Sequence, residues 1–395
     1  MSQPDVVEVI QRAKDLAPVM AARAEECETL GRLPDASFQD FRDAGFFRIC
    51  QPKIHGGYEM DLRVMYEVSR ELARGGCASS AWVMSILAIH NYYLGFFPPS
   101  AQEYIWADDQ DAQTCTPFNP AGTVKKVAGG IELSNGRWPF ASGTDHAKYA
   151  LVGVLIDSDD GSPPEFCQCV VPAEDFVIDH DSWNVAGLKG SGSKDITIDE
   201  CYIPYERICS LTQVVQGNVP GREVNTSPLY KQDFFAPSAC TLVAPAIGAA
   251  QCMLDQFTEK LGSRELVFGA GKQVEKVPSL IRLVEAESEI DSGDLLLARD
   301  SELHKQLSLS GGQPSQEQKA HSWYLNAYAT TLFTRAADRL FAASGGGALQ
   351  NSNPIQRSWR DIHAINNHGG LNFDSNAEIY ARAKLGLVVE SPLVG

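Results

Sequence analysis

Apolar positions in the first hundred residues are spaced three and four apart. Between residues 4 and 30 this spacing predicts an amphipathic helix, with its apolar positions at Val7, Ile10, Ala13, Leu16 and Met20. The pattern predicts two further helices over 62–74 and 78–95. The second is almost wholly apolar, and a helix that is apolar all round is normally buried. We therefore predict an N-terminal α-helical domain over residues 1–111.

The pattern changes near residue 114. Short apolar runs at 149–156, 167–171 and 195–203 are separated by turn residues, and no helical period is sustained. The dipeptide Asn135-Gly136 predicts a hairpin turn, because both residues tolerate the left-handed backbone that a two-residue turn needs. We predict a central β domain over residues 112–215.

Helical spacing returns after Pro228 and continues almost to the end of the chain. Long periodic stretches cover about 232–262, 275–308, 314–345 and 355–390, with glycine-rich links between them. Four long antiparallel helices with short links are typical of a bundle. We therefore predict an α+β multidomain protein that ends in a C-terminal four-helix bundle over residues 216–395.

Composition narrows the class of partner. The 395 residues include 33 Lys and Arg against 50 Asp and Glu, a net charge of −17, which disfavours nucleic acid and anionic membranes. There is no continuous run of about 18 apolar residues, and the N-terminus lacks a signal-peptide pattern. The ten cysteines form no C-x-x-C pair, so we expect buried, reduced thiols, no metal site and a cytoplasmic protein.

Nucleotide motifs are missing from the sequence. No G-x-G-x-x-G follows a predicted strand, and no G-x-x-x-x-G-K-[ST] is present. A Rossmann NAD(P) site and a P-loop ATP site are therefore both disfavoured. The hydrolase elbow G-x-S-x-G and the zinc motif H-E-x-x-H are also missing.

Three segments resemble the acyl-CoA dehydrogenase superfamily. They are the loop at residues 52–57, the strand that begins at Thr114, and the motif from Ser344-Gly345-Gly346 through Pro354 to Arg357, Arg360 and Asp361. The resemblance implies an N-terminal helical domain, a central β-barrel-like domain and a four-helix bundle. We expect the two arginines and the aspartate of the last motif to form structural ion pairs.

The base of an acyl-CoA dehydrogenase is missing at the expected positions. The family commonly places a glutamate nine residues after the arginine of the Arg-Asp pair, and this chain has Gly369 there. A second family position falls near Ser238, with Asp233 not far away. Glycine cannot abstract a proton. A divergent acyl-CoA dehydrogenase therefore remains an alternative rather than the leading hypothesis.

Two strings resemble a side branch of this superfamily, the oxygenase components of two-component flavin-dependent monooxygenases. They are residues 136–143 (GRWPFASG) and residues 187–193 (GLKGSGS). The resemblance implies FADH2 or FMNH2 from a separate NAD(P)H:flavin reductase, O2 as co-substrate and a C4a-hydroperoxyflavin. It also implies a homotetramer that hydroxylates or epoxidises a small phenol or indole. A non-catalytic flavin-binding scaffold is a second alternative.

By the same resemblance, three residues are candidates for catalysis. The hydroxyl of Ser142 can accept the flavin N5–H. His368 can exchange a proton with the peroxide, and His363 is its rival. His90, in the apolar helix, can polarise a phenol hydroxyl or an indole N–H. Two larger sets complete the predicted site: Trp138, Ser142, Gly190, Ser191, Ser193 and Arg264 for the flavin, and His90, Tyr93, Phe118 and Phe140 for the substrate.

Overall fold

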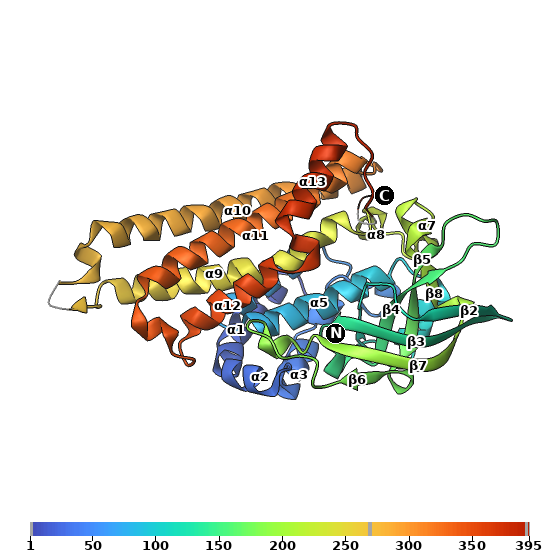
Figure 1. The fold of residues 1–395 in the computed structure, drawn as a ribbon, viewed down its shortest axis with the longest axis horizontal. Helices are drawn as coiled ribbons and strands as arrows, with labels where there is room; N and C mark the ends of the chain where they lie inside the picture. The colour runs from blue at the N-terminus through green and yellow to red at the C-terminus, as the bar shows by residue number, and fades with distance from the viewer. Residues whose placement is uncertain (1–2, 268–270, 392–393, 395) are drawn as a thin grey trace.

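The computed structural model describes residues 3–267, 271–391 and 394. An N-terminal group of helices lies between a β domain and a long bundle that projects away from it (Figure 1). The predicted helix over 4–30 is two helices, broken at Arg23. The N-terminal helices are α1 (Val6–Ala22), α2 (Ala24–Leu30), α3 (Asp35–Asp43), α4 (Leu62–Arg74), α5 (Ala78–Leu94) and α6 (Pro99–Trp106).

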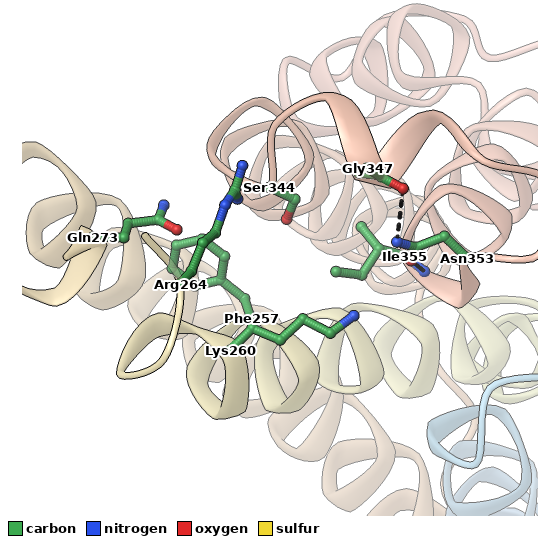
Figure 2. Close-up of a pocket in the computed structure, with 9 residues that line it drawn as sticks. Phe257, Lys260, Arg264, Gln273, Ser344, Gly347, Asn353 and Ile355 are labelled. Carbon is green, nitrogen blue, oxygen red and sulfur yellow. Dashed lines mark hydrogen bonds between the residues drawn. The ribbon is translucent and has the colours of Figure 1, made fainter. Parts of the chain in front are cut away.

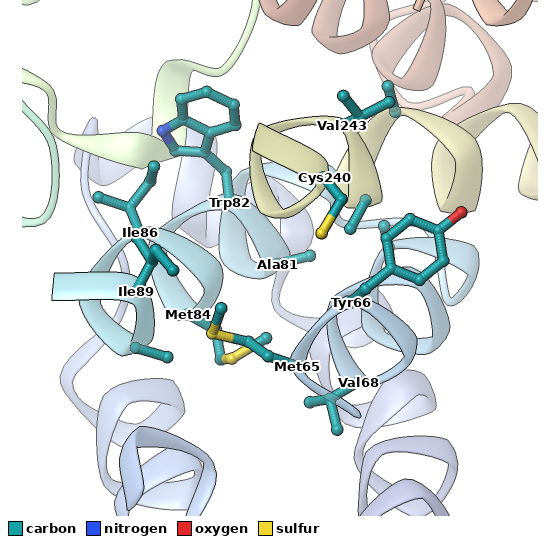
Figure 3. Close-up of a cluster of buried hydrophobic side chains, with 14 of the residues drawn as sticks. Met65, Tyr66, Val68, Ala81, Trp82, Met84, Ile86, Ile89, Cys240 and Val243 are labelled. Carbon is teal, nitrogen blue, oxygen red and sulfur yellow. The ribbon is translucent and has the colours of Figure 1, made fainter. Parts of the chain in front are cut away.

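Helix α5 is the centre of the main core, and every one of its residues is buried. Figure 3 shows side chains of α4, α5 and α9 (Ala239–Leu261) packed together, with Trp82 on α5 and Cys240 on α9. By length and composition, one helical stretch among the described residues, Ala236–Leu261, could cross a membrane. Inside the protein, 83% of its most apolar window is buried, which is typical of a core helix.

The central domain consists of two four-stranded sheets around a second core. The first has the order β1 (Thr114–Cys115), β4 (Tyr149–Ile156), β5 (Glu165–Pro172), β8 (Ile208–Ser210). The second has the order β2 (Thr123–Val127), β3 (Gly130–Ala141), β7 (Lys194–Pro204), β6 (Val177–Asp179). The two sheets face each other across side chains that include Trp138, Val152 and Ile196.

The hairpin predicted at Asn135-Gly136 is wrong. Both residues lie inside β3, where Asn135 takes a positive φ of 53°. The strand needs glycine at 136, because a Cβ there would lie 1.9 Å from the ring of Trp138. The hairpin is formed instead by Ala128 and Gly129, since Val127 pairs with Gly130 and Gly129 has a φ of 80°.

Two of the four predicted bundle helices, 275–308 and 314–345, have nearly the predicted bounds, whereas the first begins later, at Ala239, and the fourth is interrupted. Instead of one helix over 355–390, the chain forms α12, a short 3-10 turn at Gly369–Leu371, and α13. His368 caps that turn by accepting the backbone N–H of Gly370. The helices after the sheets are α7 (Leu211–Val215), α8 (Pro228–Lys231), α9 (Ala239–Leu261), α10 (Val277–Leu309), α11 (Gln316–Ala343), α12 (Pro354–Asn366) and α13 (Phe373–Lys384).

All ten cysteines are buried and free, as the sequence predicted. Their role in the fold is packing.

Candidate functional site

A chain of three serine hydroxyls lies where β3 and β7 meet. Ala141 pairs with Lys194 across the two strands, so Ser142 and Ser193 become neighbours. The Oγ atoms of Ser142 and Ser193 are 2.6 Å apart, and those of Ser193 and Ser191 are 2.8 Å apart. All three residues are buried. The structure thus brings together three residues that the sequence assigned to a cofactor.

Trp82 connects this serine chain to the bundle. Its indole Nε1–H donates to the Oγ of Ser142 at 3.3 Å, and its ring lies edge-on to the imidazole of His368, with centroids 5.5 Å apart. Helix α5, strand β3 and the break between α12 and α13 therefore meet at one point. The available sequence signal for Trp82 was an indole in a helix predicted to be buried, because a buried indole usually has a hydrogen-bond partner.

His368 is neutral over the physiological range. Packing of protein around the ring lowers its pKa to about 4, although the residue as a whole is exposed on the surface of the single subunit. Its Nδ1 accepts the backbone N–H of Gly370 at 3.2 Å, so the ring proton lies on Nε2. The neutral ring therefore has an Nε2–H donor to offer.

The rival histidine, His363, is engaged elsewhere. Its Nε2 lies 3.0 Å from Oδ1 of Asp338 on α11, and its ring lies edge-on to Trp359 at 4.6 Å. Of the two histidines, His368 is the one that contacts Trp82 beside the serine chain.

His90 is buried in the middle of α5. Its Nδ1 lies 2.6 Å from the carbonyl oxygen of Thr114. A carbonyl only accepts, so Nδ1 carries the proton and the lone pair lies on Nε2. Burial lowers the pKa of His90 to about 4, and the ring is neutral at pH 7. His90 can therefore accept a hydrogen bond from a hydroxyl.

An aromatic cluster adjoins His90 on α5. The ring of Tyr93 is 6.3 Å from His90, 5.8 Å from Phe118 and 4.7 Å from Phe234. Phe118 also meets Phe235 at 5.9 Å. The structure thus joins two predicted substrate residues, Tyr93 and Phe118, to His90.

The sequence reasoning missed Phe234 and Phe235, and it considered Ser238 only as a position for a dehydrogenase base and not as a neighbour of Tyr93. Ser238 Oγ lies 2.9 Å from the hydroxyl of Tyr93, and the carboxylate of Asp233 accepts the backbone N–H of Phe235. Two adjacent phenylalanines before a long apolar helix were the available signal. Nothing in the spacing indicated that they reach Tyr93.

Two residues of β3 lie away from their predicted sites. Trp138 is fully buried in the β core and donates its indole N–H to the carbonyl of Gly153 at 2.8 Å, so that donor is not free for a cofactor. Phe140 is 66% exposed and lies edge-on to Trp183 at 6.2 Å, outside the Tyr93 cluster. Phe140 points outward because the β3–β7 register shifts between Trp138 and Ala141, where Phe140 adopts a φ of 62°.

Gly190 also differs from its expected use. A Cβ at this position would lie 2.2 Å from the sulfur of Cys27. The close approach that Gly190 permits within the protein is to α2.

Arg264 lies just after the C-terminal end of α9. It lines a pocket of about 220 Å³ (Figure 2). None of the residues that line this pocket comes from the β domain. Arg264 donates to the carbonyl of Ala343 at 3.0 Å, and Lys260 is a second cation in the pocket. The structure does not bring Arg264 together with the serine chain of the same subunit. The pocket residues are Phe257, Lys260, Arg264, Gln273, Ser344, Gly347, Ala348, Asn353 and Ile355.

Comparison with known proteins defines the family. The model of the acyl-CoA dehydrogenase N-terminal domain matches residues 8–98, and that of the acyl-CoA dehydrogenase C-terminal domain matches residues 240–373. The chain is 34% identical over 386 residues to the flavin-dependent monooxygenase oxygenase subunit HsaA of Rhodococcus jostii, covering 98% of this chain and 100% of that protein. It is 32% identical to the oxygenase component of p-hydroxyphenylacetate 3-hydroxylase of Acinetobacter baumannii, covering 99% and 92%.

Solved structures agree with these relatives. The 3-HSA hydroxylase from Rhodococcus sp. RHA1 superposes with a TM-score of 0.91 at 34% identity, covering 98% of this chain and 99% of that one. XiaF from Streptomyces sp., in complex with FADH2 and glycerol, gives a TM-score of 0.89 at 25% identity, covering 99% and 97%. The chain belongs to the acyl-CoA dehydrogenase family and has its fold. Within that family it is a flavin-dependent monooxygenase.

Proposed function

We propose that the protein is the oxygenase component of a two-component system that hydroxylates a phenol with reduced flavin and O2. The observation that carries this proposal is that Trp82 contacts both Ser142 and His368. Trp82 lies on helix α5, which also carries His90. Relatives named p-hydroxyphenylacetate 3-hydroxylase and FADH(2)-dependent resorcinol hydroxylase act on phenols by name, which supports a phenolic substrate. A separate reductase would supply the reduced flavin.

The residues at the end of β3 fit a flavin. The serine chain offers hydroxyl donors and acceptors in a buried position, and two residues before Ser142 the exposed ring of Phe140 offers an apolar face. We therefore assign Phe140 to the flavin instead of to the substrate. When bound, reduced flavin supplies the electrons that activate O2.

Ser142 has one lone pair left for the flavin. It accepts the indole N–H of Trp82, and it can donate its own proton to Ser193. A hydroxyl oxygen has two lone pairs, so the second can accept the N5–H of the flavin without removing the proton. Ser142 would hold that proton in place.

His368 would supply a hydrogen-bond donor without a positive charge. Its Nε2–H is available because Nδ1 is occupied by Gly370, and its pKa near 4 keeps the ring neutral. A neutral imidazole can donate a hydrogen bond to a bound oxygen atom and so stabilise negative charge on it, without giving up its own proton.

His90 would orient the phenol. Its Nε2 lone pair can accept the phenolic O–H, which increases electron density at the ring carbons beside the hydroxyl. The rings of Tyr93, Phe118 and Phe234 would cover the flat faces of the substrate and exclude water.

Arg264 and Lys260 fit the phosphate of a flavin bound by a neighbouring subunit, because their pocket lies on the bundle and contains no β-domain residue. We propose on this basis a homotetramer in which bundles contribute to each other's flavin sites. The ten free thiols support a reducing, cytoplasmic setting.

The acyl-CoA dehydrogenase alternative lacks a base in this geometry. Asp233, the carboxylate near the second family position, is bound to Lys319 at 2.8 Å and accepts backbone N–H groups of Phe235 and Ala236. Ser238 is bonded to Tyr93 and to the carbonyl of Phe235. These bonds leave no free carboxylate at either position.

One assay separates the alternatives. The protein is supplied with reduced FMN or FAD, O2 and a panel of phenols, indoles and acyl-CoAs, and oxygenated product and H2O2 are quantified. Our proposal requires a hydroxylated phenol. Anaerobic bleaching of bound FAD by an acyl-CoA would indicate a dehydrogenase instead. Flavin binding without any product would indicate a scaffold.

A further inference from the structure

The loop before β7 contains an unfavourable backbone conformation. Leu188 has a φ of 52° and a ψ of 32°, in the left-handed region, where a Cβ crowds the backbone. The 3-10 turn Lys189–Ser191 follows directly and leads to Ser193. The positions of the Ser191 and Ser193 hydroxyls therefore depend on Leu188 keeping this conformation.

Helix α12 holds the loop on one side. Oδ1 of Asp361 accepts the backbone N–H of Leu188 at 2.6 Å, and Arg360 donates to the carbonyl of Ala186 at 2.5 Å. Gly187 lies so close to α12 that a Cβ would be 2.1 Å from the carbonyl oxygen of Arg360. Asp361 thus binds the backbone of Leu188, the non-glycine residue of this loop that has an unfavourable positive φ.

Helix α2 holds the loop on the other side. Gly190 packs directly on Cys27. Glu28, the next residue, accepts from Arg360 at 2.7 Å and from Arg357 at 3.3 Å. The loop is therefore fixed between two helices. The two arginines of the C-terminal motif form ion pairs with Glu28, as we expected, but Asp361 forms none among the described residues and accepts from Leu188 instead.

We propose that Asp361 is a positioning residue for the flavin: its carboxylate holds Leu188 in the left-handed conformation and thereby keeps Ser191 and Ser193 in line with Ser142. This inference rests on the proposed function, in which the serine chain contacts the flavin. A hydrogen bond to a carboxylate is stronger than one to a neutral acceptor, so the deprotonated form of Asp361 holds the loop best.

Asp361 changes charge near neutral pH. Burial raises its pKa to about 7, and its Oδ2 has no hydrogen-bond partner among the described residues. The backbone N–H of Leu188 and the two arginines lower the pKa, and Glu28 raises it. Flavin affinity should fall as the pH is lowered from 8 to 6. The charged and titratable groups that face Asp361 are Glu28 and Cys27 on α2, Cys77 before α5, and Arg357 and Arg360 on α12.

The test is the dissociation constant of reduced FMN and FAD, titrated anaerobically at pH 6, 7 and 8, with the melting temperature measured alongside. Asp361→Leu removes the acceptor and should weaken binding at least about 10-fold at every pH. Asp361→Asn keeps an acceptor without the charge, so its affinity should not depend on pH and should lie near the wild-type value at pH 6. Asp338→Asn, the same change at a partly exposed carboxylate on α11, should keep the wild-type profile.

The outcomes separate this inference from the function on which it rests. Wild-type protein that binds no reduced flavin would contradict the proposed function itself. Flavin binding that is unchanged in Asp361→Leu, or that keeps its pH midpoint in Asp361→Asn, would overturn only the positioning role. A lower melting temperature with unchanged affinity would likewise assign Asp361 to the fold alone. If Asp361→Leu does not fold, the pH profile of Asp361→Asn decides.

Discussion

The indole N–H of Trp82 points at the hydroxyl of Ser142 from 3.3 Å. This bond joins the most buried helix of the N-terminal domain to the end of β3, and it occupies one of the two lone pairs of the serine oxygen. When Ser142 donates its own proton to Ser193, the second lone pair is left for the flavin that we propose. Ser142 is therefore prepared to accept one further hydrogen bond and no more.

Ser142→Ala should divert reduced flavin to H2O2 while the fold survives. The change removes the acceptor for the flavin N5–H and leaves the buried indole of Trp82 without its partner, a loss of about 1–3 kcal/mol. The ratio of H2O2 to hydroxylated product should rise on the order of 10-fold, measured with a peroxide assay and product chromatography.

The matched control is Ser69→Ala. Ser69 is also buried, more completely than Ser142, and its hydroxyl donates to the backbone carbonyl of Ala81 on α5 and not to the proposed site. This variant should lose some stability without a change in the ratio. Equal uncoupling in both variants would mean that Ser142 acts only through stability.

His368→Asn should lower product formation, whereas His363→Asn should leave it unchanged. The first removes the neutral Nε2–H donor beside Trp82, so product formation should fall 10-fold or more while flavin oxidation continues. The second removes a partly exposed pair with Asp338, which contributes about 0–1 kcal/mol, and turnover should be retained. Rapid-mixing of reduced enzyme with O2 and substrate measures both. The assignment is wrong if His363→Asn is the variant that loses product.

The architecture and the serine chain could be predicted because both are local in the sequence. Ser142, Ser191 and Ser193 sit in two short strings that resemble those of known oxygenases, and antiparallel pairing of β3 with β7 brings them together. The break between α12 and α13 was harder to predict, since a helical period continues on both sides of it. His368 lies at that break, and the hydrogen bond from the backbone N–H of Gly370 orients its imidazole ring.

The misplaced residues depend on contacts that a single sequence does not contain. Alternation along β3 predicts which way Trp138 and Phe140 point only if the strand is regular, and the register shift between them breaks that rule. Phe234 and Phe235 reach Tyr93 because the segment before α9 folds back onto α5. Such packing between distant segments is decided by the whole core.

Acid should destabilise the protein in part through His90. The folded pKa of this residue is about 4, below the ordinary value of 6.5, because burial disfavours the charged ring. Between these values the unfolded chain binds more protons than the folded one, so stability is complete above pH 6.5 and is lost as the pH falls towards 4. The contribution of His90 to the free energy of unfolding is about 3 kcal/mol, measurable by urea unfolding at pH 4 to 7.

His90→Leu should flatten that pH dependence. Its control is Asn91→Leu. Asn91 is also buried and donates to a backbone carbonyl, that of Phe47 at 2.9 Å, but its side chain does not titrate. Asn91→Leu should lower stability by a similar amount at every pH and keep the wild-type slope. A slope that is unchanged in His90→Leu would assign the acid sensitivity to other groups.

Arg264→Gln should weaken binding of flavins that carry a phosphate and spare riboflavin, which has none. The fold should tolerate the change, because Gln273 also donates to the carbonyl of Ala343 that Arg264 contacts. A charge-assisted bond contributes about 1.5–3 kcal/mol, so the dissociation constants of reduced FMN or FAD should rise roughly 10- to 100-fold in anaerobic titrations, with a smaller effect at high salt. Arg282→Gln makes the same change on the exposed face of α10 and should bind all three flavins as the wild type does. An equal loss of riboflavin affinity in Arg264→Gln would show that the pocket affects the site through structure instead of through the phosphate.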